Sequence, residues 1–215
     1  MLTIIISIIG SGVCLYAIAR VCKCLKTNSK IREQIKEILS NEMPEIDGQY
    51  TKKQLLSYLS SLKKIYSQDE IRKQSIMSKT QYYVGLSSIC TTILFSLISL
   101  VQRIQESTLK NATPILILMT FSIFYLGFIL FISARMFNVK EYIRVPSFDS
   151  IVNLEGNKFT LYQHNEKLDI EDYVYAIETN QKVITALANQ LSTISELFLF
   201  MMMHIIIAVF MTFIY

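Results

Sequence analysis

Hydrophobic residues along the chain gather in four long blocks that are separated by ordinary charged sequence. A hydrocarbon core about 30 Å thick needs about 20 helical residues, and each block meets that length within about a turn. The charges and histidines inside the blocks are Arg20 near the end of the first, and Glu196 and His204 in the last. Because a backbone in lipid must satisfy its own hydrogen bonds, the pattern predicts four transmembrane helices. The blocks comprise residues 2–21, 84–101, 113–134 and 194–215.

The predicted fold is an all-α membrane protein in which four transmembrane helices carry cytoplasmic helical extensions. The alternatives are burial of some blocks inside a soluble bundle and, for the first block, a cleaved signal peptide. The first block has its positive charge after the apolar run and lacks an evident small-x-small cleavage site, so we expect an uncleaved anchor. The predicted segments are transmembrane helix 1 (1–22), a cytoplasmic helical segment (23–83), a transmembrane hairpin of helices 2 and 3 (84–134), a second cytoplasmic segment (135–193) and transmembrane helix 4 (194–215).

Lys and Arg residues beside the blocks predict the orientation, since cytoplasmic ends carry the excess of positive charge. The short loop between the second and third blocks holds only Arg103 and Lys110, and Glu106 opposes them. The two longer polar segments are therefore expected in the cytoplasm, with both termini on the other side. The basic residues that flank the cytoplasmic ends include Lys23, Lys26, Lys30, Arg72, Lys73, Lys79, Arg135 and Arg144.

The first cytoplasmic segment contains a helix start after a predicted loop at 41–50. Thr51 and Gln54 have the spacing of a capping box, in which each residue satisfies a backbone group of the other. The helix that follows is expected to continue through Lys79 into the second span. Its apolar face consists of Leu55, Leu59, Leu62 and Tyr66.

The second cytoplasmic segment is predicted to contain a small β-hairpin at 151–162, with Gly156-Asn157 at the turn. Asp169 is the expected N-cap of an amphipathic helix at 170–193. One face of this helix is apolar at alternating spacings of three and four, except at Asn180. The face is interpreted either as an oligomerisation stem, with Asn180 fixing the register, or as a surface that packs on Leu55–Tyr66 within the subunit. The central residues of this stripe are Ile177, Asn180, Ile184, Leu187 and Leu191.

The membrane spans carry faces of small and polar residues. Such faces allow close helix packing within or between subunits, and the polar face of the second span is alternatively the lining of a pore. His204 is expected to face the bundle interior or a water-filled path, because exposure of an ionisable side chain to lipid is costly. The faces comprise Gly85, Ser88, Thr92, Ser96 and Ser99 in the second span, Thr113, Thr120, Gly127 and Ala134 in the third, and Gly10, Cys14 and Ala17 in the first.

The composition of the chain indicates few candidate sites for catalysis, metal binding or covalent modification. The net charge of +4 is too small to indicate nucleic-acid binding, and four cysteines do not form a disulfide framework. Cys22 and Cys24 are either reduced thiols or a lipidation or redox site at the membrane edge. Successive methionines at 201–203 point to different faces of a helix, so no metal site is expected there. No catalytic or phosphate-binding motif occurs, so neither an enzyme nor a cofactor is expected.

The order of these parts resembles small bacterial membrane effectors of anti-phage defence, such as Pycsar-type and retron-associated effectors. The similar stretches are LLSYL at 55–59, SKT at 78–80 before the second span, and YAIETNQK at 175–182 before the fourth. The resemblance covers roughly residues 51–215, and the first span is additional to it. It implies an abortive-infection effector of the bacterial inner membrane, and an enzyme is the least supported class of function.

The resemblance further implies activation by a sensor protein or a nucleotide signal, followed by assembly into a homo-oligomer that permeabilises the membrane. Two other functions remain open from the sequence. One is a small constitutive ion channel or transporter subunit. The other is a membrane scaffold whose cytoplasmic helices recruit a partner.

Overall fold

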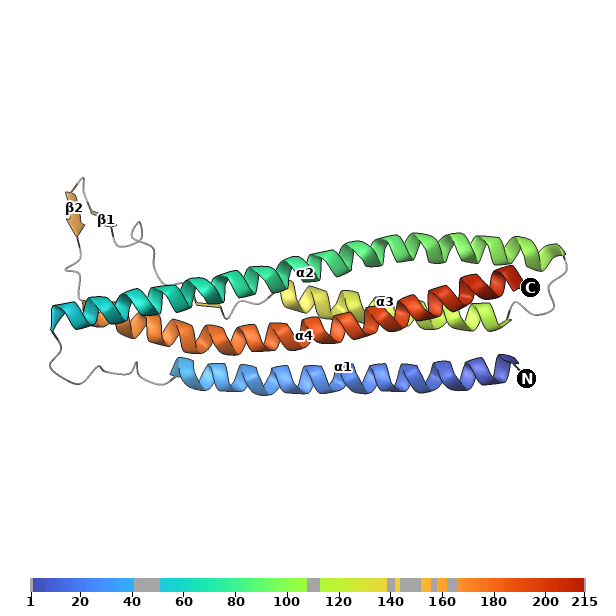
Figure 1. Ribbon diagram of the computed structural model, residues 1–215, viewed down its shortest axis with the longest axis horizontal. Helices are drawn as coiled ribbons and strands as arrows, with labels where there is room; N and C mark the ends of the chain where they lie inside the picture. The colour runs from blue at the N-terminus through green and yellow to red at the C-terminus, as the bar shows by residue number, and fades with distance from the viewer. Residues whose placement is uncertain are drawn as a thin grey trace. The chain divides into compact units, whose positions relative to one another are not determined.

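The computed structural model describes residues 2–40, 51–107, 113–138, 142–143, 152–155, 158–161 and 166–214. Within them the chain forms four long helices and one short pair of strands (Figure 1). The predicted loop at 41–50 and the predicted turn at 156–157 lie outside the described residues. In chain order the elements are α1 (Leu2–Ser40), α2 (Lys52–Ser107), α3 (Thr113–Phe137), β1 (Val152–Glu155), β2 (Lys158–Leu161) and α4 (Glu166–Ile214).

All four helices are long and apolar enough to cross a membrane, which agrees with the four predicted spans. Helix α3 is little longer than a span, whereas α1, α2 and α4 continue well beyond their apolar blocks. The segments that qualify as spans by length and composition are Ile5–Ile38, Lys53–Gln102, Thr113–Phe137 and Ile170–Thr212.

The chain divides into two compact units. The first, which we call the apolar unit, consists of Met1–Asn28, Ile76–Asn138 and Leu187–Tyr215 and contains all four apolar blocks. The second, the polar unit, consists of Ser29–Ser75 and Val139–Ala186.

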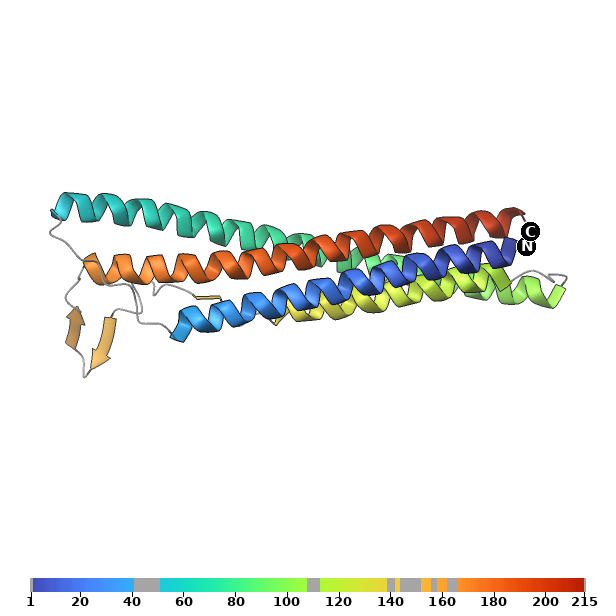
Figure 2. The same cartoon turned by 90° about the horizontal axis from the view of Figure 1, so that it is seen from below.

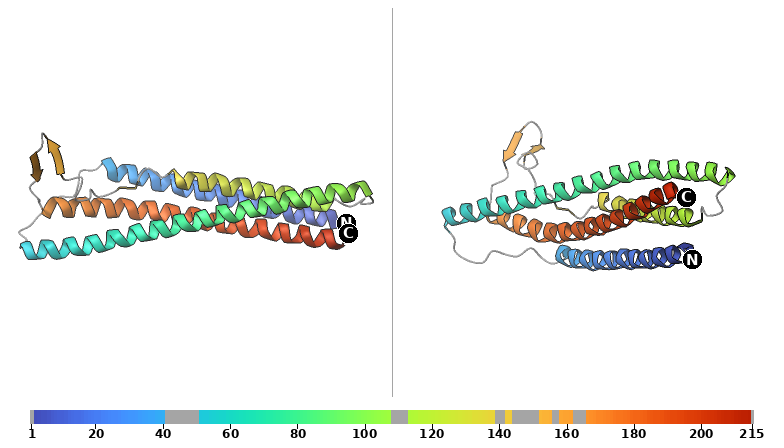
Figure 3. Two further views of the ribbon diagram at one scale, coloured as in Figure 1. Left: turned by 90° about the horizontal axis from the view of Figure 1, so that it is seen from above. Right: turned by 45° about the vertical axis from the view of Figure 1, so that its right-hand side comes forward.

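In the apolar unit α4 contacts each of the other three helices. Its Ser195 hydroxyl lies 2.9 Å from the Tyr83 hydroxyl of α2. Its Phe200 ring meets Tyr16 of α1 and Tyr125 of α3, with ring centroids 5.8 and 6.2 Å apart. Figures 2 and 3 show α4 running alongside these helices, with both chain termini at the same end of the unit. Helix α3 likewise meets α1 at Gly10 and Phe121 and α2 at Thr80 and Met136, so α3 and α4 each contact every other helix of this bundle.

A seven-residue repeat turns one side of α2 toward that bundle. Thr80, Ser87, Leu94 and Val101 are all buried. A strict seven-residue spacing keeps side chains on one face of a supercoiled helix. This buried face lies on a different side of α2 from the predicted face at Gly85–Ser99.

Helix α1 joins the bundle through small residues, as the sequence predicted. Gly10 and Ala17 are buried and Cys14 is half-buried. A Cβ atom added to Gly10 would lie 2.3 Å from the Phe121 ring of α3, so the absence of a side chain permits the close approach of α1 and α3.

In the polar unit α2 begins at the predicted cap. The backbone N–H of Thr51 donates to Oε1 of Gln54 at 3.0 Å, which is one half of a capping box. From Lys52 the helix is unbroken to Ser107, so the prediction that it continues into the second span is confirmed.

The two strands pair antiparallel, from Val152 opposite Leu161 to Glu155 opposite Lys158, within the segment where a hairpin is predicted. The predicted N-cap at Asp169 is wrong, since α4 already begins at Glu166. The intervening Glu166, Lys167 and Leu168 are all strong helix formers, which extends the helix by about one turn.

Candidate functional site

The predicted polar face of the second span points away from the bundle. We call this face the hydroxyl stripe: Gly85, Ser88, Thr92, Ser96 and Ser99. All five residues are exposed, and nothing lies within 4 Å of a Cβ placed on Gly85. Each of the four hydroxyls donates to the carbonyl four residues earlier, at 2.9–3.2 Å. Within the single chain the stripe is thus not a packing face, and of the roles considered from the sequence only those outside the single chain apply to it.

The reason lies in the short side chains of the stripe. A serine or threonine that bonds to its own helix needs no partner across the bundle. Such a hydroxyl can also face lipid at low cost, because it already donates its hydrogen bond to a backbone carbonyl of its own helix. An interface between copies and the lining of a pore stay predictions for the stripe.

The small residues of the third span also face outward. Thr113, Thr120, Gly127 and Ala134 are exposed, so they do not pack within the single chain, and packing between subunits stays a prediction. Larger side chains occupy the bundle instead, because they bury more area against α1 and α4. Those with almost no exposed surface are Met119, Tyr125, Ile129, Ile132 and Met136.

His204 lies inside the apolar unit with 7% of its surface exposed, as expected for an ionisable residue in a span. Its Nδ1 atom is 2.7 Å from the carbonyl oxygen of Phe200, so Nδ1 carries a proton and donates it. The Tyr125 and Phe121 rings of α3 lie 5.3 and 5.9 Å away between centroids. When the ring is neutral, this proton on Nδ1 leaves Nε2 as a hydrogen-bond acceptor, and the ring faces α3.

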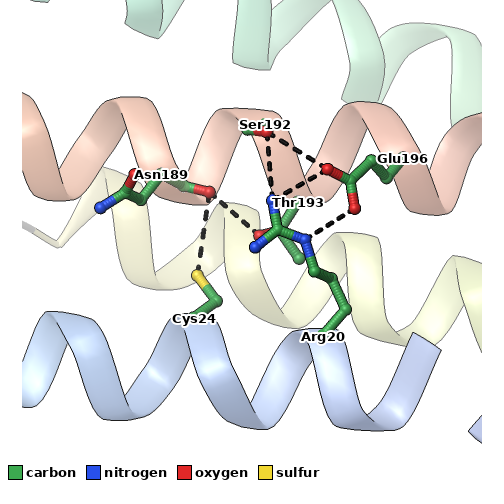
Figure 4. A network of polar contacts seen from close by, with 6 residues as sticks. All are labelled: Arg20, Cys24, Asn189, Ser192, Thr193 and Glu196. Carbon is green, nitrogen blue, oxygen red and sulfur yellow. Dashed lines mark hydrogen bonds and ion pairs between the residues drawn. The ribbon is translucent and has the colours of Figure 1, made fainter. Parts of the chain in front are cut away.

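An ion pair between two apolar blocks is the feature that the sequence interpretation missed. Nε of Arg20 lies 2.7 Å from Oε2 of Glu196, and a second guanidinium nitrogen lies 2.8 Å from Oε1 (Figure 4). Ser192 contributes a further contact to each partner at 3.4 Å. The pair is bidentate, which adds directional specificity to the attraction.

A signal for this pair was present in the sequence. Arg20 and Glu196 are the single acidic or basic residues of their blocks, and both stand where a block meets its polar neighbour. Acidic and basic side chains that lie at the same depth in neighbouring membrane helices tend to pair with one another. Next to them, the Cys24 thiol lies 3.9 Å from the Asn189 carbonyl (Figure 4), whereas Cys22 is exposed.

The apolar stripe of α4 is covered within the single chain. Ile177, Asn180, Ile184 and Leu187 are buried, and Leu191 is half-buried. In the polar unit the Tyr173 and Tyr66 rings meet edge to face at 5.6 Å, which brings this stripe to the Leu55–Tyr66 face of α2. The contacts favour packing within the subunit over an oligomerisation stem.

Asn180 hydrogen-bonds to the backbone of Ile143 in the same chain, and not to a second copy of its own helix. Its Nδ2 donates to the carbonyl oxygen of Ile143 and its Oδ1 accepts from the N–H of the same residue, both at 2.9 Å. The Tyr66 hydroxyl lies 3.4 Å from that carbonyl, and the Lys73 ammonium lies 3.5 Å from the centre of the Tyr142 ring. We call this arrangement the Asn180 clamp.

The described residues contain no group of three or more His, Cys, Asp or Glu side chains placed to hold a metal ion. No family model matches the sequence, no curated protein matches it, and no solved structure matches the fold.

Proposed function

We propose that this chain is a membrane effector of bacterial anti-phage defence that permeabilises the inner membrane when a partner protein or a nucleotide signal triggers it. The observation that carries the proposal is the outward position of the hydroxyl stripe. A row of hydroxyls on the outer surface of a membrane-crossing helix is suited to contact with further copies, or to water between them. The resemblance in layout supplies the defence context.

The proposed orientation places the polar unit in the cytoplasm and both termini outside. The basic residues beside the four blocks support it, because positively charged flanks remain on the cytoplasmic side. A cytoplasmic polar unit is also where a sensor protein or a soluble nucleotide would act.

In the proposed resting state the contacts of the single chain hold the helices together. The Arg20–Glu196 pair fastens α1 to α4, and the Asn180 clamp fastens the segment after α3 to α4. A trigger that loosens the polar unit would release the spans to associate through their hydroxyl stripes.

The test is expression in bacteria together with the triggering system, while a voltage-sensitive dye reports the membrane potential. We expect depolarisation with the natural chain, and its loss when Ser88, Thr92 and Ser96 are all replaced by leucine. Leucines at the exposed Ile89, Ile93 and Phe95 positions of the same helix serve as the matched control. An intact potential in cells where the trigger is demonstrably active would overturn the proposal.

A scaffold function has one observation in its favour. In the polar unit α2 exposes the large apolar side chains Leu56, Tyr58, Ile65 and Ile71, with 39–63% of their surfaces accessible. Exposed apolar residues on an extramembrane helix suit a protein partner. A scaffold would co-purify with that partner and conduct no ions, whereas a constitutive channel would conduct in liposomes without any partner.

A further inference from the structure

Four exposed basic side chains lie on the apolar unit at the end from which the chain continues into the polar unit. None of the four forms an ion pair with a carboxylate among the described residues. The acidic residues of this unit are Glu106, near the far end of α2, and Glu196, which already pairs with Arg20. We call the four residues the basic collar: Lys23 and Lys26 of α1, Lys79 of α2 and Arg135 of α3.

The collar lysines of α1 and α2 lie in one narrow layer. Glu196 of α4 contacts Arg20 of α1. The adjoining Ser195 contacts Tyr83 of α2, so these contacts mark one level on the three helices. With a rise of about 1.5 Å per residue, the collar lysines lie about 4.5–9 Å from that level, on the side of the polar unit. The layer is therefore about 5 Å thick, which matches the headgroup region of one leaflet at about 5–7 Å.

Helix α3 reaches the same layer at Arg135. The sulfur of the adjoining Met136 lies 3.6 Å from the hydroxyl of Thr80, which is the neighbour of Lys79. Between Arg135 and Thr113 at its other end, α3 rises about 33 Å, against about 30 Å for the hydrocarbon core. The helix length therefore places Arg135 at the boundary between hydrocarbon and headgroups, together with the collar lysines.

Exposed aromatic rings at the collar support this depth. Tyr82 is 65% exposed and lies one turn from Lys79. The Arg135 guanidinium lies 5.5 Å from the centre of the exposed Phe131 ring. Aromatic rings and long basic side chains gather at the membrane–water interface, where the ring meets the acyl chains and the charge reaches the phosphates.

The surface beside the collar limits what the four cations can bind. Toward the membrane, the neighbouring exposed side chains are large and apolar, so this surface fits an anion that carries acyl chains better than a soluble anion. Each Lys or Arg near the headgroups contributes about a fivefold preference for anionic lipid. The apolar neighbours include Leu15, Tyr16, Ile89 and Phe124.

We infer that the basic collar binds anionic phospholipids of the surrounding bilayer in preference to zwitterionic ones. The collar carries four positive charges and the net charge of the whole chain is +4, so the rest of the chain is neutral in sum. The binding belongs to a single copy of the chain and rests neither on its orientation nor on the defence role.

Fluorescence quenching of a single introduced tryptophan tests this inference, because the chain contains no tryptophan of its own. The full chain is placed in phosphatidylcholine vesicles, and either brominated phosphatidylglycerol or brominated phosphatidylcholine replaces an increasing fraction of the lipid. Bromine quenches a tryptophan that the lipid touches. With Tyr82→Trp, beside Lys79, half-maximal quenching should need about a two- to fivefold smaller fraction of the anionic lipid.

A tryptophan far from the collar is the matched control. Phe210 is 65% exposed on α4, and α4 has no Lys or Arg beyond Lys182. With Phe210→Trp, the two brominated lipids should quench at equal fractions. Equal quenching by the two lipids at Tyr82→Trp as well would overturn the inference, whether or not the protein depolarises cells.

Charge variants identify the collar as the cause. In the Tyr82→Trp background, Lys79→Gln should lower the preference for the anionic lipid by about twofold or more. Lys64→Gln makes the same charge change at an exposed position of α2 in the polar unit and should leave the preference unchanged. A preference that survives Lys79→Gln would also overturn the inference. If Tyr82→Trp does not fold, Phe137→Trp with Arg135→Gln makes the same test on α3.

Discussion

Gly10 shows at the scale of one residue how closely α1 and α3 approach. Because a Cβ there would overlap the Phe121 ring, the ring must move when any side chain is introduced. Gly10→Ala is expected to destabilise the protein by about 1–3 kcal/mol, the usual range for overpacking. Thermal unfolding in detergent measures the effect.

Two other glycines are matched controls for that substitution. Nothing lies within 4 Å of a Cβ built on Gly12 of α1 or on Gly127 of α3. Alanine at either position should leave stability unchanged or raise it by about 0.5–1 kcal/mol, since alanine favours a helix. Equal destabilisation by all three substitutions would contradict the close approach at Gly10.

The Arg20–Glu196 pair leads to a second residue-scale prediction. Arg20→Ala leaves the Glu196 carboxylate at the start of an apolar block without its bidentate partner. Because both side chains keep partial contact with solvent, we expect a loss of about 1–2 kcal/mol of unfolding free energy. Arg135→Ala is the control, since Arg135 is exposed and also stands beside a block.

A double-mutant cycle with Glu196→Gln separates the pair from other effects. If the pair is the cause, the second substitution should cost little once Arg20 is absent. Additive losses in the double variant would show that each residue acts through other contacts.

At the scale of elements the Asn180 clamp ties the segment after α3 to α4. Asn180→Leu is expected to destabilise the polar unit by about 1–2 kcal/mol, because the part-buried N–H of Ile143 loses its acceptor and the Ile143 carbonyl keeps only the longer contact from Tyr66. Hydrogen exchange at the Ile143 amide should speed up accordingly. Gln181→Leu is the control, since Gln181 is the exposed neighbour.

The same substitution separates the two interpretations of the apolar stripe. A polar asparagine at a stem position lowers stability while fixing the register, so its replacement by leucine would raise stability and change the oligomer. A more stable chain of altered subunit number would therefore contradict the clamp.

The four apolar helices were predictable from the sequence, whereas the side of each helix that is buried in the bundle was only partly predictable. The apolar stripe of α4 was found because large side chains recur there with helical spacing. For α2 and α3 the small and polar residues indicated packing within or between subunits without deciding which, and these residues lie on the outside of the single chain. In a membrane helix both sides are apolar, so hydrophobic periodicity carries little information about which side is buried.

At the scale of the whole molecule, the hydroxyl stripe predicts contact between copies. With the four native cysteines replaced by serine or alanine, Ser96→Cys should form disulfide-linked dimers in membranes after triggering. A cysteine at Ser122, which is buried within the bundle, should not cross-link. Cross-linking is read from non-reducing gels, and equal behaviour of the two cysteines would contradict an interface at the stripe.

The sequence by itself determined that four helices are long and apolar enough to cross a membrane, because span length and backbone hydrogen bonding depend on local composition alone. It also determined where α2 begins, through a cap of neighbouring residues. Only the tertiary structure decided that α3 and α4 each contact every other helix of the bundle, that Arg20 meets Glu196 and that Asn180 binds Ile143. These contacts join residues distant along the chain, and no spacing rule within one helix specifies its partner on another.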